Sequence, residues 1–225
     1  MKVTYYGHAC FGVETEKVNL LFDPFISPNS IAKTIDVDTL KADYILLSHG
    51  HEDHVADAER IAKNTGAKIV SNFEIVSWYE NKGIAGHPMN IGGKWNFDWG
   101  TVKYVNAVHS SVLPDGTYGG NPGGFVIEIA DKTFYYAGDT ALTYDMKLLS
   151  EQYQLDFAFL PIGDNFTMGV EDALVASNFI KCDQIIGMHY DTFGYIEIDK
   201  SKAQTAFKNN NKELTLLTIG NHIIL

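Results

Sequence analysis

The sequence predicts an α/β protein, and three observations support this prediction. Short runs rich in β-branched and aromatic residues recur along the 225 residues, which is typical of strands. Segments with helical spacing lie between many of these runs, as expected where strands and helices alternate. Polar residues gather where the apolar runs end. Because α/β proteins build their sites from loops at strand ends, these positions are where we look for function.

The first three apolar runs, at residues 2–6, 10–15 and 18–22, predict an antiparallel meander. The last of them ends in "DPF", where Pro24 breaks the strand pattern. The next run, "ADYILLS" at residues 42–48, is continuously apolar, which indicates a strand buried on both faces.

Strand and helix patterns then alternate to the end of the chain. The glycine-rich segment 115–124 predicts either a flexible active-site loop or a long turn. The helical patterns cover residues 56–64, with Gly66 as C-cap, 74–81, 142–153, 170–180 and 201–209. The strand patterns cover residues 67–72, 101–111, 125–140 with a turn at 131–132, 156–164 and 184–189, followed by a closing strand or hairpin within 214–225.

Length and composition predict one domain over residues 1–225, since no linker or repeat divides the chain. The net charge of −11 argues against a broad nucleic-acid footprint. No apolar window reaches membrane-span length, and the N-terminus does not look like a signal peptide. With only Cys10 and Cys182, neither in a CxxC pair, a disulfide framework is not expected and a cytoplasmic location fits best.

The most informative stretch is "SHGHEDH", which follows the apolar run at residues 42–48. His49, His51, Asp53 and His54 form the pattern H-x-H-x-D-H. Imidazole and carboxylate groups are preferred ligands of divalent metal ions. Three of the 8 histidines of the chain fall in this window, so a metal site is favoured over an exposed polar turn.

This motif resembles the signature of the metallo-β-lactamase superfamily, and later segments supply its partners in order. His109 lies near a predicted strand end, "YYAGDT" carries Asp139, and "GMHYD" carries His189. The resemblance covers nearly the whole chain and implies a four-layer αββα sandwich with two mixed β-sheets. It implies that His49, His51 and His109 hold one metal ion, that Asp53, His54 and His189 hold a second, and that Asp139 bridges them.

Two divalent ions so placed would acidify a bridging water to hydroxide and polarise the electrophile, so the resemblance implies hydrolysis. Zinc is expected, with manganese or iron as alternatives, because the ligand types separate these metals poorly. As a ligand, Asp53 would be ionised and would orient the hydroxide. The segments "YYGHACF" and "LPIGDNFTMGVEDA" look most like the stand-alone hydrolase branch that includes ascorbate-6-phosphate lactonase. A small ester or lactone, phosphorylated or not, is therefore the expected substrate.

Further candidates lie close to these ligands in the chain. His8 either approaches the metals or the substrate in a catalytic role or has a structural role in its turn. Two roles are open for Asp164, Asn165 and Thr167. They either contact the substrate or support the histidine ligands, or they form an N-cap or a turn. Asp191 either orients a ligand imidazole or lies in an exposed turn.

Two other functions remain open at this point. A phosphodiesterase or nuclease could use the same two-metal site, although the net charge of −11 argues against it. A non-catalytic metal-binding protein could keep the fold without turnover. We expect a small-molecule substrate, neither nucleic acid nor membrane as a partner, and edge strands that would allow a homo-oligomer.

Overall fold

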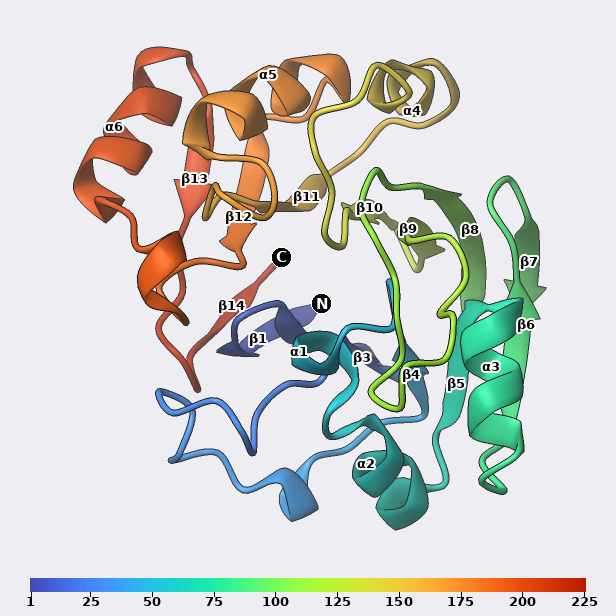
Figure 1. The fold of residues 1–225 in the computed structure, drawn as a ribbon. Coiled ribbons are helices and arrows are strands. Elements are labelled where there is room, and N and C mark those ends of the chain that lie inside the picture. Colours follow the sequence, from blue (N-terminus) through green and yellow to red (C-terminus); the bar gives the residue numbers. More distant parts are fainter. The chain divides into compact units, whose positions relative to one another are not determined.

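The computed structural model describes residues 1–225 and divides the chain into two compact units. Each unit contains one seven-stranded sheet and its own helices (Figure 1). The prediction of a single domain over residues 1–225 concerns the chain as a whole and stays a prediction. Unit 1 consists of Met1–Ile91, Ser110–Pro122 and Leu217–Leu225, and unit 2 consists of Gly92–His109 and Gly123–Leu216.

The sheet of unit 1 has the order β14-β1-β2-β3-β4-β5-β6. Its first three chain segments form the predicted antiparallel meander. From β3 onward the neighbours pair in parallel, so the sheet is mixed. The strands are β1 (Lys2–Gly7), β2 (Cys10–Glu14), β3 (Asn19–Phe22), β4 (Tyr44–Leu46), β5 (Lys68–Asn72), β6 (Gly86–Met89) and β14 (His222–Ile224).

Helices cover part of this sheet because their apolar faces need burial. Helix α3 (Phe73–Glu80) packs against β5 and β6 (Figure 1). Helix α2 (Ala58–Thr65) ends at Gly66, which has φ 77° and is the predicted C-cap. The one-turn helix α1 (Glu52–Val55) and the 3-10 turn η1 (Val37–Thr39) were not predicted, since such short helices lack a periodic pattern.

The sheet of unit 2 has the order β13-β12-β11-β10-β9-β8-β7. Strands β10 to β13 pair in parallel, whereas the pairs from β7 to β10 are antiparallel. The strands are β7 (Lys94–Phe97), β8 (Gly100–Asn106), β9 (Gly123–Ile129), β10 (Lys132–Tyr136), β11 (Phe157–Pro161), β12 (Gln184–Met188) and β13 (Glu213–Thr215). The helices are α4 (Met146–Gln152), α5 (Val170–Phe179), α6 (Lys200–Asn209) and the 3-10 turn η2 (Gly194–Ile196).

Three predictions of secondary structure are corrected by the structure. Helix α4 begins at Met146 rather than at residue 142, because the N–H of Ala141 is bound to the carbonyl of Val108 outside any helix. Strands β6 and β7 were not predicted; β6 contains a proline and β7 is largely exposed. The closing segment is no hairpin, since β13 and β14 belong to different sheets.

The predicted fold class is confirmed: the chain is an α/β protein with two mixed β-sheets. Strands β4 ("YIL") and β12 ("QIIGM"), which precede candidate ligands, are mostly buried, whereas β8, which precedes His109, is only partly buried. A rigid, buried strand fixes the start of the loop that follows it, so side chains at that point are held in place. None of the helices has the length and apolar character needed to span a bilayer.

Candidate metal centre

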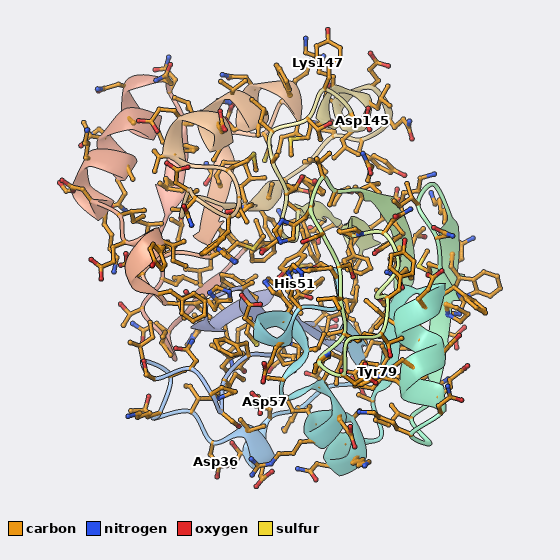
Figure 2. The ribbon with its side chains drawn as sticks, in the orientation of Figure 1. Asp36, His51, Asp57, Tyr79, Asp145 and Lys147 are labelled. Atoms are coloured by element: carbon orange, nitrogen blue, oxygen red, sulfur yellow. The ribbon has the colours of Figure 1, made fainter.

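In unit 1, the H-x-H-x-D-H turn begins two residues after β4 ends at Leu46. His49 is fully buried, and its Nε2 lies 2.9 Å from Nδ1 of His51. His51 is the residue at which α1 begins, and Figure 2 labels it there. The hydroxyl of Ser110 lies 3.3 Å from Nε2 of His51 and can accept its proton. That tautomer leaves Nδ1 of His51 as a metal ligand beside the Nε2 of His49.

Asp23 positions the candidate ligands His49 and His54 of unit 1. It follows β3 directly and is fully buried. One carboxylate oxygen accepts the N–H of Ser48 at 2.8 Å. The other accepts the hydroxyl of Ser48 at 2.5 Å and lies 2.8 Å from Nδ1 of His54. A carboxylate accepts but does not donate, so Asp23 holds the proton of His54 on Nδ1.

The carboxylate of Asp23 also determines which nitrogen of His49 carries the proton, through the hydroxyl of Ser48. The Ser48 hydroxyl gives its proton to Asp23, so it can only accept from Nδ1 of His49, 2.9 Å away. His49 and His54 are therefore both held with the proton on Nδ1 and a lone pair on Nε2. This is the form in which imidazole binds a metal ion.

A second buried carboxylate fixes the segment after Asp23. Asp57 is 3 % exposed, and its Oδ2 accepts the N–H groups of Ile26 and Ser27 at 2.7 and 2.8 Å. Its own N–H donates to the carbonyl of Pro24. Figure 2 labels Asp57 at the start of α2. The segment that carries Asp23 is thus fastened to the junction of α1 and α2.

His8 lies with the predicted ligands of unit 1. It is fully buried in the turn between β1 and β2, with φ 55°. Its Nε2 is 3.1 Å from Oδ2 of Asp53, and the same oxygen is 3.8 Å from Nε2 of His54. The candidate ligand atoms of His8, Asp53 and His54 all lie within 4.8 Å of one another. Both roles that the sequence left open for His8, catalytic and structural, agree with this position.

Cys10 lies at the start of β2 and is also fully buried. Burial, reinforced by the negative charges of Asp23 and Asp57, raises the pKa of the Cys10 thiol well above its ordinary value. A thiol that keeps its proton is a poor metal ligand, because the thiolate is the binding form. Cys10 and Cys182 are both free thiols and both buried.

In unit 2, the predicted bridging residue lies between two histidines. One oxygen of Asp139 is 2.9 Å from Nε2 of His189 and 3.6 Å from Nε2 of His109. Asp139 is 2 % exposed. Strands β8, β10 and β12 run in the same direction, so the residues that follow them meet at one edge of the sheet. Two hydrogen bonds join the segments that follow β8 and β10. The N–H of Val108 donates to the hydroxyl of Thr140, and the carbonyl of Val108 accepts the N–H of Ala141.

The other candidates of unit 2 lie in turns. Asp164 and Asn165 both have positive φ, at 63° and 57°, and Asp164 accepts the N–H of Asn165. The hydroxyl of Thr167 lies 3.3 Å from the carbonyl of Met168. These bonds agree with the turn interpretation, and a substrate role for the three residues stays a prediction.

Asp191 has both carboxylate oxygens occupied by partners other than His189. Oδ1 accepts the N–H of Ile198 at 3.0 Å, and Oδ2 is paired with Lys200 at 2.8 Å. These contacts favour the turn role that the sequence left open for Asp191 over the orientation of a ligand imidazole.

Of the glycine-rich segment 115–124, residues 115–122 belong to unit 1 and residues 123–124 begin β9. Val112 and Tyr118 form a bridge in this region. Ser111 donates to the carbonyl of Gly119 and accepts the N–H of Gly50, in the middle of the histidine motif. The buried amide of Asn72 donates to the loop at Gly119. These hydrogen bonds therefore fix the glycine-rich loop against the histidine motif.

Three residues of this site were not predicted: Asp23, Ser48 and Asp57. A signal was present for the first two, since both follow apolar runs and Ser48 precedes the motif. Their hydrogen bonds join positions 25 to 31 residues apart, and such pairing cannot be read from local spacing.

The donor set fits divalent metal ions: imidazole nitrogens in the binding tautomer and carboxylate oxygens, grouped at strand ends. The fold and these clusters define a metal-binding α/β protein with two mixed sheets. A family model described as the beta-lactamase superfamily domain matches residues 2–189. The chain belongs to the metallo-β-lactamase superfamily.

Comparison with individual proteins agrees with this assignment. The chain is 61% identical, over 100% of both chains, to a protein of Flavobacterium johnsoniae named UPF0173 metal-dependent hydrolase. It also resembles the solved structure of Igni18, a metallo hydrolase of Ignicoccus hospitalis, with a TM-score of 0.90, 34% identity and coverage of 99% and 97% of the two chains. An isothiocyanate hydrolase from Delia radicum gut bacteria has a TM-score of 0.79 with 18% identity over 100% and 99% of the chains, which shows a common fold alone.

Proposed function

We propose that the protein is a cytoplasmic dinuclear metal-dependent hydrolase that cleaves a small ester or lactone. The observation that supports this most directly is the preset tautomer of His49 and His54, since Asp23 and Ser48 leave Nε2 of both rings able to bind a metal ion. The hydrolase name of the 61% identical relative supports the reaction class. Two unpaired thiols support a reducing compartment.

Each predicted ligand has a role in this proposal. His49 and His51 would hold one ion together with His109, and Asp53 and His54 would hold the second together with His189. Asp139 would serve both ions, and this role is supported by the one carboxylate oxygen that faces both His109 and His189. Zinc suits this donor set best, with manganese and iron as alternatives.

Bound ions would supply hydroxide near neutral pH and polarise the carbonyl oxygen of the substrate. Asp53 would orient the nucleophile through a carboxylate oxygen, and His8 would keep that oxygen in place from 3.1 Å. Water adds to the acyl carbon, the bond to the alkoxy oxygen breaks, and the alcohol leaves with a proton. For a lactone, acid and alcohol remain in one product molecule.

The test is the metal content per polypeptide of the wild type and of Asp139→Ala, measured by elemental analysis. About two ions are expected in the wild type and one or none in the variant, because a bridging ligand serves both ions. His222→Ala is the control, since His222 lies exposed on β14 and should not alter metal content. A wild type that binds no metal, or an Asp139→Ala protein with two ions, would contradict the proposal. Lactones, esters and phosphodiesters are then screened as substrates.

A further inference from the structure

Two loops of unit 2 leave the sheet beside the candidate ligands Asp139 and His189. The first loop, residues 162–169, follows β11, and the second, residues 190–199, follows β12. Strands β10, β11 and β12 are parallel neighbours, and Asp139 lies beyond the end of β10. Both loops therefore start at the edge of the sheet that carries the ligands.

The first loop is held by its own backbone. The N–H of Asp164 donates to the carbonyl of Met168 at 3.0 Å, across a turn in which Asp164 and Asn165 have positive φ. Phe166 follows at the tip of the turn. Met168 also donates to the carbonyl of Thr140, the neighbour of Asp139. The position of Phe166 is thus coupled through hydrogen bonds to that of the bridging carboxylate.

The second loop is held in a similar way. Asp191 accepts the N–H of Ile198 and is paired with Lys200, and its own N–H closes the turn that contains η2. Tyr195 lies in the middle of η2. The hydrogen bonds and the ion pair of Asp191 therefore fix the backbone that carries the side chain of Tyr195.

The two loops meet at the backbone of His189. A Cβ atom on Gly163 would lie 2.1 Å from the carbonyl oxygen of His189 and 3.0 Å from Cβ of Ile196. Only a residue without a side chain allows this close approach. The first loop therefore rests directly on the ligand residue and on the turn of the second loop.

Phe166 and Tyr195 contact each other across these loops. Their ring centroids are 6.3 Å apart with an interplanar angle of 80°, and the residues are 51% and 79% exposed. Isolated exposed aromatic residues are common on protein surfaces. Phe166 and Tyr195 differ from isolated rings, because they come from two loops that are fixed by backbone hydrogen bonds and that start beside the candidate ligands.

Another ring pair in unit 2, with Tyr144 exposed and Phe179 half-buried, shows the contrast. Tyr144 and Phe179 also pack edge to face, but the ammonium of Lys147 lies 4.2 and 4.6 Å from their ring centroids. That pair already has a cation as its partner. Loops 162–169 and 190–199 contain four carboxylates, Asp164, Asp191, Glu197 and Asp199, and no lysine or arginine. Lys200 follows the second loop and neutralises Asp191. The other three carboxylates remain in excess, and this charge disfavours a phosphorylated group and favours a neutral apolar one.

We propose that Phe166 and Tyr195 form an aromatic subsite that binds a neutral aryl or other apolar substituent of the substrate. This inference rests on the proposed function and narrows its substrate class, from phosphorylated or neutral compounds to neutral esters and lactones with an apolar group. The rings stack against the substituent, and the acyl carbon then lies towards Asp139 and His189. Both residues determine specificity and take no part in bond cleavage.

The test compares γ-butyrolactone with γ-phenyl-γ-butyrolactone in the metal-loaded enzyme. In Phe166→Ala/Tyr195→Ala, the ratio of kcat/KM for the phenyl lactone to that for the unsubstituted lactone should fall at least about 10-fold. Tyr144→Ala is the matched control, an exposed ring removed from the other pair, and should leave the ratio unchanged. Phe166→Leu and Tyr195→Phe give intermediate ratios, and they replace the double variant if it does not fold.

A second measurement separates this inference from the proposed function. The non-hydrolysable lactam 5-phenyl-2-pyrrolidinone is titrated into wild type and variants, and binding is followed by NMR against 2-pyrrolidinone. If neither lactone is hydrolysed but the phenyl lactam binds and the double variant loses it, the subsite stands and the proposed reaction is wrong. If the phenyl lactam binds no better than 2-pyrrolidinone, or binds the double variant equally well, the aromatic subsite is refuted whatever the enzyme hydrolyses.

Discussion

Replacement of Asp23 by asparagine should separate metal binding from folding. Oδ1 of Asp23 faces the N–H of Ser48, so this position must remain an oxygen. The amide nitrogen then occupies the Oδ2 position and points a donor at Nδ1 of His54, 2.8 Å away. His54 can accept that bond only by moving its proton to Nε2, which blocks the nitrogen that would bind metal.

The expected magnitudes follow from the bonds that each variant keeps. Asp23→Ala leaves three buried donors without their acceptor, at about 1–2 kcal/mol each, so the free energy of unfolding should fall by about 3–6 kcal/mol. Asp23→Asn keeps the shape and one acceptor, and should lose only about 1–2 kcal/mol. Metal affinity should fall about 10- to 100-fold in both variants.

Urea denaturation of the metal-free proteins gives the stabilities, and competition with a chromophoric chelator gives the metal affinities. Nitrogen chemical shifts of His54 report its tautomer directly. An Asp23→Asn protein that folds, keeps the proton of His54 on Nδ1 and binds metal as tightly as the wild type would show that Asp23 does not set the tautomer.

Three further changes test the surroundings of the site. Gly163→Ala should lower the free energy of unfolding by about 1–3 kcal/mol, because the new Cβ lies 2.1 Å from the carbonyl oxygen of His189; urea denaturation checks this. Asn72→Ala removes the cap of α3 and two bonds to the glycine-rich loop, and should cost about 2–4 kcal/mol by the same measurement. Burial raises the pKa of the Cys182 thiol to about 11 and holds that of Cys10 well above its ordinary value. At pH 8 iodoacetamide should therefore alkylate both at least about 100-fold more slowly in the folded than in the urea-unfolded protein, and rapid labelling of the folded protein would contradict this.

The sequence predicted those features that depend on local pattern. The meander of β1 to β3, the buried strands β4 and β11 and the C-cap at Gly66 follow from alternation, apolar runs and glycine conformation. The grouping of Asp139 with His109 and His189 was implied by the family resemblance, and the structure brings these residues together because strands of one direction end at the same edge of the sheet.

Features that depend on distant pairing were missed. Strand β7 is an exposed edge strand, so it lacks the apolar alternation that marks a half-buried one. The separation of β13 and β14 into different sheets depends on which partner strand each finds. Asp23 was noted only for the proline that follows it, since its partners Ser48 and His54 lie in another part of the chain.

The backbone of His8, Asp23 and His189 has a consequence for how this protein tolerates change. All three have positive φ, at 55°, 40° and 57°, a conformation that costs a residue with a side chain on the order of 1 kcal/mol and costs glycine almost nothing. Glycine would relax each turn and remove the donor atom that the turn presents. At Asp23 this gain is smaller than the loss of the bonds to Ser48 and His54, so glycine there would lower the free energy of unfolding. The strained turns persist because each presents a buried side chain whose contacts glycine cannot replace.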